Sequence, residues 1–122
     1  MIKKKTLRVG LRYKGKKIFL NVRKCGYFGE AFGLMFQKKE NAGALLFDFS
    51  GRKRLALHSF FVFFPFLAIW LDDKNKIVEK KIVKPFSISI YPKEPFSKIV
   101  EIPLNKKYNK TVRKLVDKER FK

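Results

Sequence analysis

The start of the chain alternates apolar and polar side chains, and this alternation constrains the fold more than any other feature. From Leu7 to Tyr13 every second residue is apolar, and the pattern resumes from Ile18 to Val22. Successive side chains of a β-strand point to opposite faces of a sheet, so this period is typical of a strand with one buried face. Lys14-Gly15-Lys16 separates the two segments and supplies a turn. The sequence therefore predicts a β-hairpin from about residue 6 to residue 24.

A long apolar run extends from Leu55 to Leu71 and is interrupted by Pro65. Proline lacks the amide donor that a β-ladder requires, so Pro65 divides the run at a bend or at a sheet edge. An apolar strand on each side of it, covered on both faces, explains why polar residues do not alternate here. The run spans 17 residues and contains His58 and Ser59, slightly short for a bilayer crossing. We expect two buried strands and no transmembrane segment.

The rest of the chain predicts one more helix, further strands and a helical tail. Between residues 26 and 37, apolar side chains recur three and four residues apart, which predicts a short helix. The tail from Asn105 onward places apolar residues on one side and Lys or Arg around them, which predicts a basic amphipathic helix of about three turns. The other predicted elements are a buried strand at 44–49, a turn at 50–53, a hairpin loop at 72–76, and strands at 77–83 and 98–102.

Together these elements predict a single domain, residues 1–122, of the α+β class. Its sheet is expected to be mostly antiparallel and strongly curled or barrel-like. One short helix follows the first hairpin, and a basic helix or tail occupies residues 105–122. The composition is 46% hydrophobic, which suits a chain that buries a core of its own.

The charge is strongly unbalanced, because 30 Lys and Arg residues face 10 Asp and Glu residues and give a net charge of +20. Compositional bias of a genome explains part of this excess. A polyanionic partner explains it equally well, either nucleic acid or an anionic membrane surface bound peripherally. Lysine supplies 23 of the basic residues and meets phosphate as a point charge. This favours contact with a phosphate backbone over recognition of individual bases.

Basic residues are densest in the tail, where residues 105–122 hold 8 Lys and Arg against two acids. A single focused surface requires the tip of the first hairpin, with its three lysines, to converge with this tail. The residues that we predict to contact a polyanion are Lys106, Lys107, Lys110, Arg113, Lys114, Arg52, Lys53 and Arg54.

Catalytic chemistry has weak support in the sequence. Cys25 is the only cysteine, which excludes an internal disulfide and fits a reducing compartment such as the cytoplasm. His58 is the only histidine, which excludes a metal site built from several histidines. Cys25 and His58 are the candidates for a thiol centre, although no flanking signature supports them. We predict no cofactor and no metal, and the basic start of the chain lacks the apolar stretch of a signal peptide.

Several short segments occur in an order that is similar to one known family. They are Gly33-Leu34-Met35-Phe36, residues 43–49, residues 58–67 with His58 and Pro65, Lys84-Pro85-Phe86, and residues 100–103. These segments resemble the Gly-Leu-Met-Phe signature and the later motifs of the domain-of-unknown-function 192 family, small proteins of bacteria and archaea. The resemblance covers about residues 18–104 and implies a compact β-rich fold. It implies no activity, because the family has no established one.

The chain departs from that family at two positions beside Pro65. The family has Arg and Asp where this chain has Phe63 and Leu67. Loss of both polar groups together leaves a core that need be no less stable. It also removes the strongest candidate for chemistry shared with the family, and it leaves the role of His58 open.

Three hypotheses about function follow. The first is a non-enzymatic binding module that contacts nucleic acid phosphates without sequence specificity. The second is a barrel that binds a ligand or a protein through its Phe-rich interior or a hydrophobic patch. The third, with the weakest support, is an enzyme centred on His58 and Cys25. The sequence leaves the oligomeric state and the identity of the ligand open.

Overall fold

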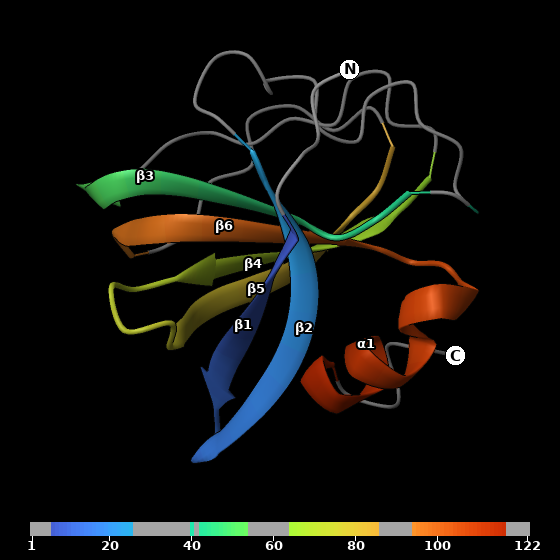
Figure 1. Cartoon of the computed structure of the whole chain (residues 1–122), viewed down its shortest axis with the longest axis horizontal. Coiled ribbons are helices and arrows are strands. Elements are labelled where there is room, and N and C mark those ends of the chain that lie inside the picture. The colour runs from blue at the N-terminus through green and yellow to red at the C-terminus, as the bar shows by residue number, and fades with distance from the viewer. Residues whose placement is uncertain (1–5, 26–39, 41, 54–63, 86–93, 117–122) are drawn as a thin grey trace.

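The computed structural model describes residues 6–25, 40, 42–53, 64–85 and 94–116, and for Cys25 and residues 49–53 it describes the backbone alone. In these residues six strands form one sheet in the order β1-β2-β3-β6-β4-β5 (Figure 1). A short 3-10 helix, η1, and a short α-helix, α1, follow the last strand. The bounds are β1 Thr6–Tyr13, β2 Lys16–Cys25, β3 Leu45–Lys53, β4 Phe66–Leu71, β5 Ile77–Val83, β6 Phe96–Pro103, η1 Lys106–Tyr108 and α1 Asn109–Leu115.

The predicted hairpin is confirmed as β1 and β2, joined by a two-residue turn. Tyr13 pairs with Lys16, and the two residues between them both have positive φ, 51° at Lys14 and 76° at Gly15. Two central residues with positive φ form a type I′ turn, whose twist matches the right-handed twist of the strands on either side. Glycine adopts this conformation without strain, whereas Lys14 adopts it at some cost.

The sheet is mixed, which refines the mostly antiparallel arrangement expected from the sequence. β2 runs parallel to β3, and the other neighbouring pairs are antiparallel. The turn predicted at residues 50–53 is wrong, because β3 continues to Lys53. Its register with β6 shifts between Asp48 and Lys53. Pairing with β6 resumes at Lys53, opposite Phe96, and the extra residues between these pairs form a β-bulge or a similar irregularity of β3.

The sheet curls so that its two edges approach each other, as predicted for a curled or barrel-like sheet. The backbone N–H of Arg12 in β1 donates to the carbonyl of Asn75, at the tip of the β4–β5 hairpin, over 2.9 Å. Lys80 of β5 places its Nζ 5.1 Å from the centre of the Tyr13 ring. These contacts bring the two edge strands together at one end and give the sheet the form of a half-barrel (Figure 1).

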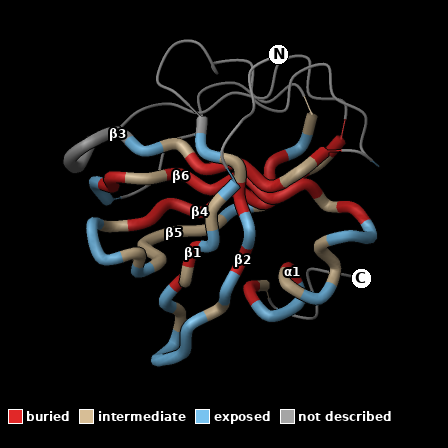
Figure 2. Tube along the Cα trace, viewed as in Figure 1, coloured by how far each residue is buried: buried red, intermediate tan, exposed pale blue. Residues whose placement is uncertain are grey.

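Buried residues concentrate along the central strands (Figure 2), and they form two clusters to which successive residues of β4 contribute in turn, so both faces of the sheet are covered. β4 follows Pro65 and is buried at all six positions, as predicted for a strand covered on both sides. The strand predicted before Pro65 and the helix predicted at residues 26–37 lie outside the described residues. The helix-side cluster is Val9, Leu11, Leu20, Val22, Ala44, Leu46, Leu67, Ile69, Leu71, Val100, Ile102, Val112 and Leu115. The second cluster is Ala42, Leu45, Phe64, Phe66, Ala68, Trp70, Val83, Phe96 and Ile99.

The C-terminal helix is shorter than predicted, because η1 takes the first turn and the chain is extended again at Val116. Val112 and Leu115 bury the apolar side of α1 in the helix-side cluster. The Tyr108 hydroxyl accepts a hydrogen bond of 2.8 Å from the N–H of Ala44, just before β3. These contacts fix the helix against the sheet. In the described part of the chain, none of the helices has the length and apolar character needed to span a bilayer.

The turn geometry predicts how substitutions of Gly15 affect stability. Gly15→Ala forces a Cβ into the left-handed region and is expected to lower the free energy of unfolding by roughly 1 kcal/mol. Gly15→Asn is the matched control, because asparagine tolerates this region better and is expected to lose less. Urea unfolding of both variants measures the difference. Equal losses would contradict a backbone origin.

Candidate binding groove

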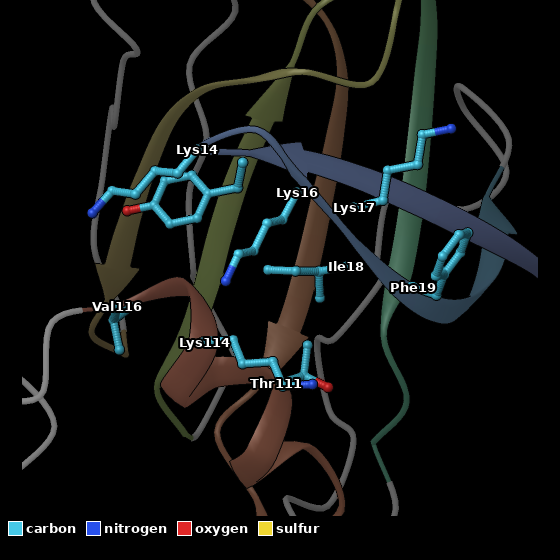
Figure 3. A pocket seen from close by; sticks show the side chains of 9 residues that line it. Lys14, Lys16, Lys17, Ile18, Phe19, Thr111, Lys114 and Val116 are labelled. Atoms are coloured by element: carbon cyan, nitrogen blue, oxygen red, sulfur yellow. The ribbon is translucent and has the colours of Figure 1, made fainter.

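A hollow of about 680 Å³ lies between the β1–β2 hairpin and α1. Figure 3 shows Lys16 of the hairpin facing Thr111 and Lys114 of α1 across this hollow. The hairpin forms one wall and the helix forms the other. The lining residues are Tyr13, Lys14, Lys16, Lys17, Ile18, Phe19, Thr111, Lys114 and Val116.

A second hollow of about 590 Å³ continues along β2 and shares Phe19 and Thr111 with the first. Its far wall is formed by η1 and by the segment that enters β3. The two hollows together are called the β2–α1 groove. The residues of the second hollow are Thr6, Phe19, Leu20, Asn21, Val22, Arg23, Gly43, Ala44, Lys107, Tyr108 and Thr111.

The β2–α1 groove carries positive charge from two distant parts of the sequence. Six basic residues line it, and none of the described lining residues is acidic. The convergence required by the sequence analysis, between the hairpin tip and the C-terminal helix, is therefore present. Like charges held this close raise the local positive potential and attract an anionic ligand. The basic residues are Lys14, Lys16, Lys17 and Arg23 from the hairpin, and Lys107 and Lys114 from η1 and α1.

Phe19 lines both hollows and is exposed, with 52% of its surface accessible, and Figure 3 shows its ring directed away from Thr111 and Lys114. It sits opposite Gly10, where a Cβ would come within 3.2 Å of the ring. The Arg8 guanidinium lies 4.4 Å from the ring centre. Glycine on the neighbouring strand thus makes room for the ring, and Arg8 adds a cation–π contact. An exposed aromatic ring beside cations can stack on a base or cover an apolar side chain.

The predicted contact residues divide into three groups. Lys107 and Lys114 line the groove. Lys106, Lys110 and Arg113 are exposed on the same two helices but do not line it. The remaining three candidates cannot be assigned to the groove. Arg52 and Lys53 belong to β3, where the structure describes their backbone alone, and Arg54 lies outside the described residues.

The proposed thiol centre cannot be assembled from the described residues. His58 lies outside them, as does Phe63. Cys25 ends β2 and pairs in register with Phe47, but its side chain is not described. Leu67, where the resembling family has Asp, is fully buried in the helix-side cluster.

Sequence analysis missed several groove residues, although one signal for them was present. Phe19 stands at a position of the hairpin alternation where a polar residue is expected, so an outward aromatic could have been inferred. Nothing comparable identifies Arg23, Tyr108 or Thr111, because their place in the groove depends on how α1 packs against the sheet.

Glu101 is the buried carboxyl of the described structure. It lies on the central strand β6 between Leu45 of β3 and Ala68 of β4, both of which belong to the second cluster. Directly opposed side chains share a face, so the carboxyl enters an apolar environment. Burial raises the pKa of Glu101 to about 8. In the residues that the structure describes, the carboxyl has no hydrogen bond or ion pair.

This buried carboxyl predicts a pH-dependent stability. An unfolded Glu loses its proton near pH 4.5, whereas folded Glu101 keeps it until about pH 8. Because the folded state holds the extra proton, its stability falls as pH rises through this window, by roughly 1 kcal/mol per pH unit. Glu101→Gln should remove this component and be more stable than the parent protein at pH 8.

Urea unfolding at pH 5 and pH 8 measures the effect. Glu94→Gln is the matched control, since Glu94 is exposed just before the same strand. Parallel pH curves for the parent protein and Glu101→Gln would contradict the prediction.

No family model and no curated protein matches this sequence. Two solved structures are similar in fold. A proposed transcription regulator from Sinorhizobium meliloti 1021 has 18% identity and a TM-score of 0.72, over 92% of this chain and 90% of its own. A protein of unknown function from Novosphingobium aromaticivorans DSM 12444 has 12% identity and a TM-score of 0.70, over 88% of this chain and 79% of its own. At these identities the likeness shows the fold alone, and the resemblance to the domain-of-unknown-function 192 family stays a prediction.

Proposed function

We propose that this protein is a non-enzymatic binding module that holds a polyanionic chain in the β2–α1 groove. The observation that carries the proposal is the convergence of six basic residues from the hairpin and the C-terminal helices on the two adjoining hollows of the β2–α1 groove. The absence of acidic side chains among its described lining residues supports the same conclusion, because an acid would repel the ligand.

Recognition by this groove depends on charge more than on sequence. Five of the six basic residues are lysines, which meet anionic groups as flexible point charges. Nucleic acid phosphates are the polyanion that the sequence analysis favours, and Phe19 adds a surface on which a base could stack. Single-stranded RNA is therefore the first probe of the charged groove. Anionic liposomes are the second, since a lipid surface offers phosphates of similar chemistry.

Salt dependence gives the proposal a quantitative test. A single strand that engages all six basic residues of the groove has about six phosphates neutralised, and each releases about 0.7 of a counterion. The logarithm of the binding constant for single-stranded RNA is then expected to fall with the logarithm of salt concentration with a slope of about −4. Fluorescence anisotropy of labelled RNA across a salt series measures this slope.

Two substitutions on the same helix separate the groove from the net charge. Lys114→Glu reverses a charge inside the groove and is expected to weaken RNA binding by about tenfold. Lys110→Glu is the matched control, because it makes the same change of net charge on an exposed residue of α1 outside the groove. Its expected effect is distinctly smaller.

Equal losses in these two variants would contradict a role for the groove and would assign binding to the overall charge. Flat anisotropy traces for RNA and for anionic liposomes at physiological salt would argue against binding of phosphate polyanions. Binding of the acidic peptide described below would then be needed to sustain the proposed function.

A further inference from the structure

Among the described residues, one edge of β2 lacks a partner strand along most of its length. β2 pairs with β1 from Lys16 to Arg23, but its parallel pairing with β3 covers only Arg23–Cys25 in the described part of the chain. With respect to the residues that the structure describes, the first half of β2 is therefore an open edge. An open edge presents unpaired backbone N–H and C=O groups that can pair with another extended chain.

The hairpin geometry identifies which backbone groups face outward. In a hairpin with a two-residue turn, the residues that flank the turn form a hydrogen-bonded pair, and bonded and non-bonded pairs then alternate. Tyr13 and Lys16 flank the turn, so Lys17, Phe19 and Asn21 occupy non-bonded positions. Their N–H and C=O groups point away from β1.

Two observed hydrogen bonds confirm this alternation. The N–H of Arg23, in step with these three residues, donates to the carbonyl of Ala44 over 2.9 Å. On the other strand, the N–H of Arg12 points outward to Asn75. No such bond to the outward N–H groups of Lys17, Phe19 or Asn21 is present within the described residues.

The β2–α1 groove runs along this open edge. Its two hollows together include every residue of β2 from Lys16 to Arg23. The opposite wall is formed by η1 and α1, which do not supply a strand. Space for an extended chain therefore lies directly beside the unpaired backbone groups. At about 3.3 Å per residue, the stretch from Lys17 to Asn21 accommodates roughly five residues of such a chain.

The pattern of donors and acceptors decides which kind of chain fits. Each outward residue presents an N–H donor and a C=O acceptor side by side. A peptide strand offers both complementary groups, whereas a phosphate backbone offers only acceptors and would leave the outward carbonyls facing oxygen lone pairs. A second copy of β2 would bring Lys16 and Lys17 against like charges, which disfavours pairing between copies.

We infer that the β2–α1 groove receives an extended acidic peptide from another protein, which adds to the open edge of β2 as a further strand. This inference rests on the proposed function, because the same basic groove supplies the attraction. Backbone hydrogen bonds to Lys17, Phe19 and Asn21 hold the peptide in register. Alternate acidic side chains of the peptide meet Lys114 and Lys107 of the opposite wall.

The test compares two peptides of identical charge. One is a capped peptide of alternating Glu and Val, and the other carries N-methyl groups on alternate residues so that it cannot donate to β2. Both alternating patterns of N-methylation are made, and the one that removes the donors facing β2 is the informative peptide. Fluorescence anisotropy is expected to show binding of the unmethylated peptide and at least about tenfold weaker binding of that methylated peptide. Equal binding of both peptides would overturn strand addition.

Amide hydrogen exchange provides a direct readout on the unmodified protein. The amides of Lys17, Phe19 and Asn21 are expected to exchange fast in the free protein and to become protected when the peptide binds. The neighbouring amides of Ile18 and Leu20 bond to β1, so they serve as internal controls that are protected in both states. Unchanged exchange at the three outward amides in a saturated complex would overturn the inference.

A variant of β2 tests the same contact from the protein side. Asn21→Pro removes an outward N–H, and proline is tolerated where its nitrogen faces away from a ladder. It is expected to weaken peptide binding by about tenfold relative to Asn21→Ala, which keeps the N–H. The peptide comparison stands independently if the proline variant fails to fold.

The outcomes separate the two proposals. RNA binding that depends on Lys114, without peptide binding, would overturn strand addition and leave the charged groove as a phosphate site. If RNA, anionic liposomes and the acidic peptide all fail to bind at physiological salt, both proposals are overturned.

Discussion

The divergence of β2 from β3 is the constraint on which the rest of this structure depends. The two strands pair in parallel only at Arg23–Cys25, as far as the described chain extends. Toward its turn the hairpin has no pairing with β3, and its other edge is held at the tip of β4–β5 by the bond from the N–H of Arg12 to the carbonyl of Asn75. Within the described residues an opening therefore remains beside the first half of β2. The open edge and the groove both follow from that divergence.

The C-terminal helix occupies one side of this opening and turns it into a groove. Val112 and Leu115 anchor the helix in the apolar interior, while the Tyr108 hydroxyl receives the N–H of Ala44 beside the start of β3. An unpaired amide at that position would carry a desolvation cost, so this bond both satisfies the backbone and fixes the helix. The apolar side of α1 is thereby buried, and Lys114 remains available to the groove.

Charge and backbone geometry make different demands on a ligand. The six basic residues of the groove attract any polyanion, and this attraction weakens with salt. The outward N–H and C=O groups of β2 are complementary to a chain that both donates and accepts hydrogen bonds at a fixed spacing. A long exposed edge is also a hazard for self-association, and lysines along it oppose pairing between identical chains. If the inferred strand addition holds, the same lysines protect the free protein and select an acidic partner.

Local patterns in the sequence were enough to predict the hairpin, the buried strand after Pro65, the strands β5 and β6 and the basic amphipathic character of the tail. Each is encoded by a period, an apolar run or a turn residue within a short segment. Lys107 and Lys114, two of the residues predicted to contact a polyanion, line the groove, and the contact itself stays a prediction. The predicted turn at residues 50–53 was wrong, because β3 continues there and pairs with β6 again at Lys53. Three features became visible only in the tertiary structure: the parallel pairing of β2 with β3, the burial of Glu101, and the approach of the β1–β2 hairpin to α1. These features join residues far apart in the chain, and contacts of that kind leave no periodic signal in the sequence.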